Sequence, residues 1–164
     1  MAIARTLRTY LDTHNVQYDT VPHTHTETAM DSARSAHVPV HQMAKAVVLE
    51  DEQGYIVSVL PSNNRLDLNW VNDELERHLE LASEPELPGL FSDCATGAVP
   101  ALSEAYGLDV IWDDHLKHVS DIYIEAGDHE HLIHLRGDDF RQLMSNLPHS
   151  IISFSEDYSS WKYE

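Results

Sequence analysis

Residues 44–60, AKAVVLEDEQGYIVSVL, carry the clearest structural signal in the chain. Two apolar runs, at residues 44–49 and 55–60, are rich in valine and isoleucine, and a polar turn that ends at Gly54 separates them. Such side chains favour strands, and a short turn with a glycine joins antiparallel strands. The sequence therefore predicts a β-hairpin of two largely buried strands.

The segment before this hairpin predicts two helices and a strand. Residues 2–13 have apolar side chains at helical spacing, and residues 17–21 alternate as a short strand that Pro22 ends. The pattern Thr24-x-x-Glu27 is typical of a capping box and predicts the start of a second helix.

The segment after the hairpin mixes helices and strands in the same way. The expected elements are a helix capped by Asp67, a short helix opened by Ser83-x-x-Glu86, a strand at 110–112, a hairpin of residues 122–124 and 132–135 that turns at Gly127, and a helix capped by Asp138. Helices and strands do not alternate regularly, and two hairpins are present. We therefore expect a mixed α/β (α+β) fold with a largely antiparallel sheet.

Length and charge limit the classes of function. A chain of 164 residues with 42% hydrophobic content is sufficient for one core, so one domain is expected. Ten basic against 28 acidic side chains give a net charge of −18, which excludes a generally basic protein that coats nucleic acid, and no DNA partner is expected. Residues 1–49 hold four bases and four acids, so we expect a polyanionic ligand to approach this neutral third.

Several common sites and locations have no sequence support. No apolar run has the roughly 18 residues of a spanning helix, so we expect a cytoplasmic protein without a membrane partner. Neither GxGxxG nor GxxxxGK[ST] occurs, so no nucleotide cofactor, and no other cofactor, is expected. Cys94 is the only cysteine, which rules out an intrachain disulfide. No base lies near Cys94 in sequence, so packing is a simpler explanation for it than nucleophilic catalysis.

Lys45 is a candidate site residue because it lies in an apolar run of a chain with only two other lysines, Lys117 and Lys162. Apolar surroundings disfavour a charged ammonium unless an anion or a carbonyl lies nearby. The alternative is a lysine on an edge strand whose ammonium reaches water.

The segment Gly97-Ala98-Val99-Pro100 is a second candidate. Its glycine lets the backbone approach a ligand closely, and its proline stiffens the loop. Backbone amides held in this way can stabilise an oxyanion. An ordinary turn is the alternative.

Histidines are numerous, twelve in all, and His23-x-His25 and His129-x-His131-x-x-His134 are the closest to a metal-binding pattern. On a strand, His129 and His131 share a face and His134 points to the other. No carboxylate or cysteine completes a known ligand spacing, so no metal site is predicted.

The order of several short motifs resembles that of a known family. In chain order these are Pro22-His23-Thr24, Thr28-Ala29, Ala44-Lys45-Ala46-Val47-Val48, Val59-Leu60-Pro61, Leu66-Asp67-Leu68, Leu81-Ala82-Ser83-Glu84-x-Glu86-Leu87, Leu90-Phe91-x-Asp93-Cys94, Gly97-Ala98-Val99-Pro100, Tyr106-Gly107-Leu108 and Ala126-Gly127-x-His129. Residues 1–147 thereby resemble the YbaK/prolyl-tRNA-synthetase-associated domain family.

The resemblance implies a curved, partly barrel-like sheet with flanking helices, and hydrolysis of the ester bond of a mischarged aminoacyl-tRNA. Family members are inserted in prolyl-tRNA synthetase or free-standing, and this chain is similar to the free-standing ones. The expected partners are the 3′ acceptor end of an aminoacyl-tRNA and an aminoacyl-tRNA synthetase. The editing-like domain is expected at residues 1–147, and residues 148–164 are expected to be an appended tail whose apolar side chains pack on this domain or on a partner.

The resemblance also implies site residues. Lys45, Gly97 and Ala98 are expected to be catalytic, with loop amides binding the oxyanion and Lys45 neutralising charge or anchoring the 3′ end. The substrate-binding residues implied are Val99, Pro100, His129, His23 and Thr28. No general base is assigned. Two alternatives remain open, namely a non-catalytic module that holds an amino-acid-like ligand or a protein partner, and a histidine-based metalloprotein.

Overall fold

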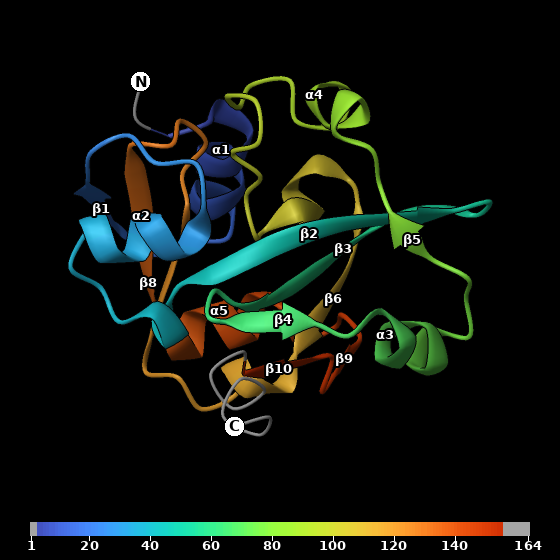
Figure 1. The fold of residues 1–164 in the computed structure, drawn as a ribbon. Coiled ribbons are helices and arrows are strands. Elements are labelled where there is room, and N and C mark those ends of the chain that lie inside the picture. Colours follow the sequence, from blue (N-terminus) through green and yellow to red (C-terminus); the bar gives the residue numbers. More distant parts are fainter. Residues whose placement is uncertain (1–2, 156–164) are drawn as a thin grey trace, which may run out of the picture.

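The predicted hairpin lies at the centre of a five-stranded sheet in the computed structural model, which describes residues 3–155 (Figure 1). Strands β2 (Ala44–Asp51) and β3 (Gly54–Pro61) pair antiparallel, with Lys45 opposite Leu60. Gly54 has a φ of +122°, a backbone conformation that glycine adopts readily, so it permits the tight turn. The hairpin prediction is confirmed.

The other strands of this sheet come from distant parts of the chain. β5 (Glu80–Leu81) pairs with the far end of β2, whereas β6 (Asp109–Asp113) and β9 (His149–Ser150) extend the sheet beyond β3 through parallel pairings. The strand order is therefore β5-β2-β3-β6-β9.

Two smaller sheets complete the β structure. The first has the antiparallel order β1 (Asp19–Pro22), β8 (His131–Arg136) and β7 (Asp121–Glu125). The second pairs β4 (Asn64–Leu66) with β10 (Ser153–Ser155). A single bridge between Met43 and Tyr123 connects the first sheet to the start of β2. The predicted mixed α/β class with mostly antiparallel strands is confirmed, and within residues 3–155 the sheets do not close into a barrel.

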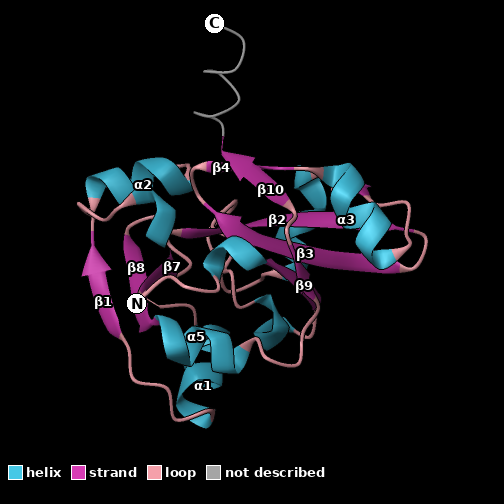
Figure 2. Ribbon diagram, turned by 90° about the horizontal axis from the view of Figure 1, so that it is seen from below, coloured by secondary structure: helices cyan, strands magenta, loops and turns pink. Residues whose placement is uncertain are grey.

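Within the described residues 3–155, five α-helices flank the sheets, and α2 and α3 lie at opposite ends of the β2–β3 hairpin (Figure 2). They are α1 (Arg5–Thr13), α2 (Ala29–Ser35), α3 (Leu68–Leu75), α4 (Leu87–Leu90) and α5 (Gly137–Leu143). Short 3₁₀ turns lie at Val40–Gln42, Glu84–Glu86, Ser103–Tyr106 and Asp114–Leu116. No helix within residues 3–155 is long and apolar enough to cross a membrane.

Of the predicted helix starts after the hairpin, one has the expected side-chain cap and two do not. The Asp67 carboxylate accepts a hydrogen bond from the Trp70 amide, as predicted for the start of α3. By contrast, α5 begins after Arg136 without a side-chain cap, and Asp138 lies inside its first turn, where it accepts a hydrogen bond from Arg141. The Ser83 side chain also makes no capping bond.

The predicted capping box at Thr24 is wrong, and the difference positions the site. The amides of His23 and Thr26 donate to the carbonyls of Glu130 and His129, which keeps this segment extended beside the turn that precedes β8. The helix α2 therefore begins four residues later, where the Thr28 side chain accepts from the Asp31 amide at 3.1 Å. Residues 24–28 consequently run along the turn between β7 and β8.

The main core lies between the five-stranded sheet and helices α1 and α5. Leu7 and Leu11 of α1 are fully buried in the same cluster as Phe140 of α5. A smaller cluster below α3 contains Ile152, which is fully buried, so the chain after residue 147 contributes to this core. Of the other apolar residues of the expected tail, Ile151 is exposed and Phe154 lies in β10. Tyr158, Trp161 and Tyr163 lie outside the described residues, as do Met1 and Ala2.

Candidate active site

A cavity of about 180 Å³ brings together four segments that are far apart in the sequence. They are the start of α2, the start of β2, the loop before residue 100 and the turn that follows β7. The cavity is lined by Glu27, Thr28, Ala29, Ser32, Met43, Ala44, Lys45, Ala46, Gly97, Val99, Glu125 and His129. Five of the eight residues predicted for the site are among them.

Lys45 reaches the cavity because, near its start, β2 has a neighbouring strand on only one side, which is β3. β5 pairs only with Leu49 and Glu50 of β2, so the strand beside Lys45 borders the cavity instead. Lys45 is half-buried, between two alanines that also line the cavity. A cationic side chain is thus held in a small cavity together with the carboxylates of Glu27 and Glu125.

The loop of residues 95–100, here called the Gly97 loop, offers only some of its backbone amides to a ligand in the cavity. Gly97 has a φ of +81°, and the Ala98 amide donates to the carbonyl of Ala95 at 3.0 Å, which closes a turn. The Ala98 amide is therefore occupied, and Pro100 has no N–H. Within residues 3–155 the amides of Gly97 and Val99 donate to no protein acceptor, and both residues line the cavity. The donors available for an oxyanion are thus Gly97 and Val99.

His129 fixes the Gly97 loop through a hydrogen bond to its backbone. Its side chain is 6% exposed, and Nε2 lies 2.7 Å from the carbonyl oxygen of Thr96. A carbonyl can only accept, so Nε2 carries the proton and donates it to this bond. The imidazole packs against Gly97, at 3.8 Å from the position a Cβ would take there. His129 therefore fixes the position of the Gly97 loop.

Glu125 is held by the turn that carries His129. One carboxylate oxygen, Oε2, accepts hydrogen bonds from the amides of Gly127, Asp128 and His129 at 2.8, 3.2 and 3.2 Å. The other oxygen, Oε1, lies 3.9 Å from Nδ1 of His129. The Glu125 side chain is 12% exposed, so it is a largely buried carboxylate fixed at the cavity wall.

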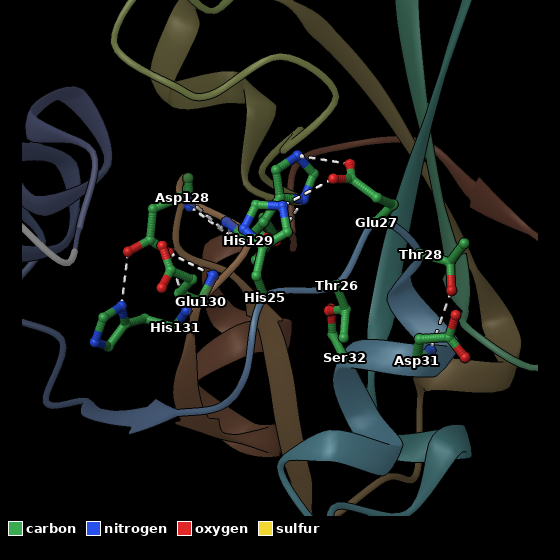
Figure 3. Close-up of polar contacts among 12 residues, drawn as sticks. His25, Thr26, Glu27, Thr28, Asp31, Ser32, Asp128, His129, Glu130 and His131 are labelled. Atoms are coloured by element: carbon green, nitrogen blue, oxygen red, sulfur yellow. Dashed lines mark hydrogen bonds and ion pairs between the residues drawn. The ribbon is translucent and has the colours of Figure 1, made fainter.

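Glu27 lies at the cavity mouth between two imidazoles (Figure 3). Its Oε1 is 2.8 Å from Nε2 of His25, and its Oε2 is 3.6 Å from Nε2 of His129. The hydrogen bond with His25 holds the pKa of the Glu27 carboxyl below its usual value, and the charge of His129 adds to this effect. Glu27 is thus a carboxylate at neutral pH.

A second, wider hollow of about 550 Å³ adjoins the cavity. The two share Glu27, Ala46, Gly97 and Val99, and the wider one extends over the apolar side chains of Leu81 and Leu87. A ligand in the cavity can therefore continue into this hollow.

The family model of the aminoacyl-tRNA editing domain matches residues 23–143, which is more than half of the chain and includes every segment of the cavity. The chain belongs to the aminoacyl-tRNA editing domain family. No curated protein matches the chain.

Three solved structures share the fold of this editing domain. A hypothetical protein, APE2540, has a TM-score of 0.80 at 16% identity over 92% of this chain and 100% of its own. A proposed trans-editing enzyme for prolyl-tRNA synthetase has a TM-score of 0.77 at 22% identity over 93% and 97% of the two chains. A proposed signal-transduction protein from Marinobacter aquaeolei VT8 has a TM-score of 0.75 at 19% identity over 92% of this chain and 30% of that protein.

The editing domain gathers some predicted residues at the cavity and leaves others outside. Thr28, Lys45, Gly97, Val99 and His129 line it, whereas three other predicted residues do not. Those three are Ala98, Pro100 and His23. Ala98 and Pro100 are buried and shape the loop. His23 lies at the end of β1, where Nδ1 donates to the carbonyl of Thr24 and Nε2 is buried without a partner.

Two carboxylates at the cavity were missed from the sequence. Glu27 was attributed to a capping box, and Glu125 has no local signal because its binding to three amides depends on the turn after it. The hydrogen bonds to the turn between β7 and β8 that move the start of α2 also place Glu27 at the cavity.

The other residues considered for chemistry have structural roles. Burial raises the pKa of the Cys94 thiol to about 12, so it is protonated at neutral pH and a poor nucleophile. His131 and His134 are paired with Asp128 and Asp121 at 2.7 and 2.8 Å. Within residues 3–155 no three His, Cys, Asp or Glu side chains are arranged to hold a metal ion.

Proposed function

We propose that this editing domain is a free-standing aminoacyl-tRNA deacylase, which hydrolyses the ester of a mischarged tRNA. The observation that carries the proposal is the cavity itself, in which Lys45 lies with the two unoccupied amides of the Gly97 loop. An aminoacyl ester is already activated, so its site has mainly to orient the ester and stabilise the oxyanion.

The proposed mechanism gives each group one task. When water or a substrate hydroxyl attacks the ester carbonyl, the amides of Gly97 and Val99 bind the oxyanion that forms. Lys45 neutralises the developing charge or anchors the 3′ end of the tRNA. His129 is a positioning residue, because its bond to Thr96 fixes the loop that carries these amides.

The wider hollow gives the acceptor end a place to lie. The aminoacyl group would occupy the 180 Å³ cavity, and the terminal nucleotide would lie over Leu81 and Leu87 in the adjoining hollow. The rest of the tRNA would approach the neutral first third of the chain, where Arg5, Arg8 and Arg34 are the available cations. A cytoplasmic location and a synthetase partner belong to the same proposal.

Deacylation of four charged tRNAs tests the proposal. Esters of alanine, serine, cysteine and proline are incubated with wild type, with Lys45→Ala and with the control Lys117→Ala, at low and high salt. Lys117 is a surface lysine, 3.8 Å from Asp114 and outside the cavity. We expect wild type and the control to hydrolyse one or two esters, Lys45→Ala to hydrolyse none, and high salt to slow turnover because it weakens phosphate contacts.

Two results would contradict the proposal. Unchanged turnover by Lys45→Ala, with its thermal unfolding also unchanged, would remove Lys45 from catalysis. No turnover of any ester by wild type, together with tight binding of an aminoacyl-adenosine mimic, would favour the non-catalytic binding module.

A further inference from the structure

The cavity contains a fixed carboxylate that the proposed reaction does not use. Glu125 lies within the same cavity as Lys45 and the Gly97 loop, yet an oxyanion repels a carboxylate, so it has no place in stabilising that charge. A largely buried carboxylate needs a partner for its charge. For Oε2 the three backbone amides supply it.

The direction of Glu125 is set by those amides. All three amides donate to Oε2, so Oε1 accepts none of the hydrogen bonds that hold the side chain. Oε1 lies 3.9 Å from Nδ1 of His129, which is too far for a hydrogen bond.

The substrate of the proposed reaction brings one cation into this cavity. An α-amino group is protonated below a pKa of about 7.7–8.0, and it is joined to the carbon next to the ester carbonyl. In a cavity of about 180 Å³, an ester carbonyl at the Gly97 loop leaves the attached ammonium close to the cavity walls, which include Glu125. The complementary group for an ammonium is a carboxylate oxygen, and charge-assisted hydrogen bonds are the strongest of the available contacts.

We propose, on the basis of the proposed function, that Oε1 of Glu125 binds the α-ammonium group of the aminoacyl ester and makes the enzyme selective for a free amino group. An N-acylated ester has a neutral amide at that position, which cannot neutralise Glu125 and needs additional space. N-acylated aminoacyl-tRNAs, including peptidyl-tRNA, are therefore rejected. Glu125 is a specificity-determining residue in this proposal and takes no proton during the reaction.

The test compares one ester with and without a free amino group. Wild type, Glu125→Gln and the control Glu130→Gln are given the ester from the four-tRNA panel that wild type hydrolyses fastest, and the same ester after N-acetylation. The side-chain amide of Glu125→Gln retains an oxygen for the three backbone amides but directs an NH₂ group, which is a donor, at the ammonium. Glu130 is exposed, lies on the turn that follows Glu125 and does not line the cavity. The Glu130→Gln variant therefore controls for the effect on tRNA binding of removing one negative charge.

We expect wild type and Glu130→Gln to prefer the free ester strongly, by about 10- to 100-fold in kcat/KM, the effect of one hydrogen bond to a charged group. Glu125→Gln should lose most of this preference, through slower hydrolysis of the free ester and an unchanged rate on the N-acetylated one. Circular dichroism and thermal unfolding establish that the variant is folded. The ratio of the wild-type kcat/KM values for the free and the N-acetylated ester tests the selectivity even without a variant.

Four results would overturn the inference, and each points to a different explanation. Equal wild-type rates on both esters would remove the selectivity and leave the proposed deacylase intact. An equal loss on both esters in Glu125→Gln would assign Glu125 to catalysis, as a base, and an undiminished preference would assign the selectivity to another residue. No hydrolysis of any ester would overturn the proposed function, and this inference with it.

Discussion

At the scale of single residues, Gly137 is closely surrounded by backbone and has no room for a side chain. It begins α5, its amide donates to the carbonyl of Ser120, and a Cβ at this position would lie 1.9 Å from the carbonyl oxygen of Val119. Because that oxygen also accepts a hydrogen bond from Arg141, it has little freedom to move.

Gly137→Ala is therefore expected to lower the free energy of unfolding by about 1–3 kcal/mol, the usual cost of overpacking. Gly89→Ala is the matched control, because a Cβ there meets nothing within 4 Å and the residue lies in a helix. Urea denaturation of both variants measures the difference. Equal stability of the two variants would contradict the close approach at Val119.

Single residues also show what a sequence can predict about a site. Lys45 and Gly97 were candidates from their local sequence and His129 was implied by the family resemblance, and all three line the cavity. Glu27 and Glu125 were not found, because the first depends on where α2 begins and the second on three amides of a turn. Their contacts arise from chain packing, which leaves no local pattern.

At the scale of elements, an ion pair links the β2–β3 hairpin to the segment after α3. Arg77 donates to both carboxylate oxygens of Asp51, with Nε to Oδ2 at 2.8 Å and Nη2 to Oδ1 at 2.5 Å, and also to the carbonyl of Gly54. The hydrogen bond from Arg77 lowers the pKa of Asp51 to about 2.

This pair predicts a pH dependence of stability. In the unfolded chain an aspartate titrates near about 3.9, so between pH 4 and about 2 the unfolded state binds the proton and the folded state does not. The contribution of the pair is therefore fully present above pH 4 and is lost as pH falls toward 2. Arg77→Gln should be less stable than wild type at pH 7, and the difference should shrink over this acid range in urea denaturation at fixed pH. A constant difference would contradict the role of Asp51.

The elements that depend on local pattern were predicted well. The two apolar runs of the central hairpin pair across one turn, and Asp67 caps α3, both as expected. The predicted start of α2 was wrong because hydrogen bonds to the turn before β8 keep residues 23–26 extended, against the local capping signal. The parallel pairing of β3 with β6 joins strands about fifty residues apart, and nothing in either strand specifies that partner.

At the scale of the whole molecule, charge acts on stability and on binding in opposite directions. A net charge of −18 destabilises the folded state by self-repulsion, which salt reduces. We expect the melting temperature to rise as sodium chloride increases from about 0.01 M to about 0.1 M, where the screening length falls from about 30 to about 10 Å. Differential scanning calorimetry measures it, and a flat or falling curve would contradict the dominance of repulsion. Slower deacylation over the same range could then not be due to unfolding.

The walls of the cavity come from residues 27–32, 43–46, 97–99 and 125–129, and no two of these segments are neighbours in the sequence. Any molecule that occupies the cavity therefore binds the native state and has nothing comparable to bind in the unfolded chain. Occupancy must raise the free energy of unfolding by an amount that grows with ligand concentration. Ligands of this cavity can thus be found by thermal-shift screening of amino-acid derivatives, before any turnover has been detected.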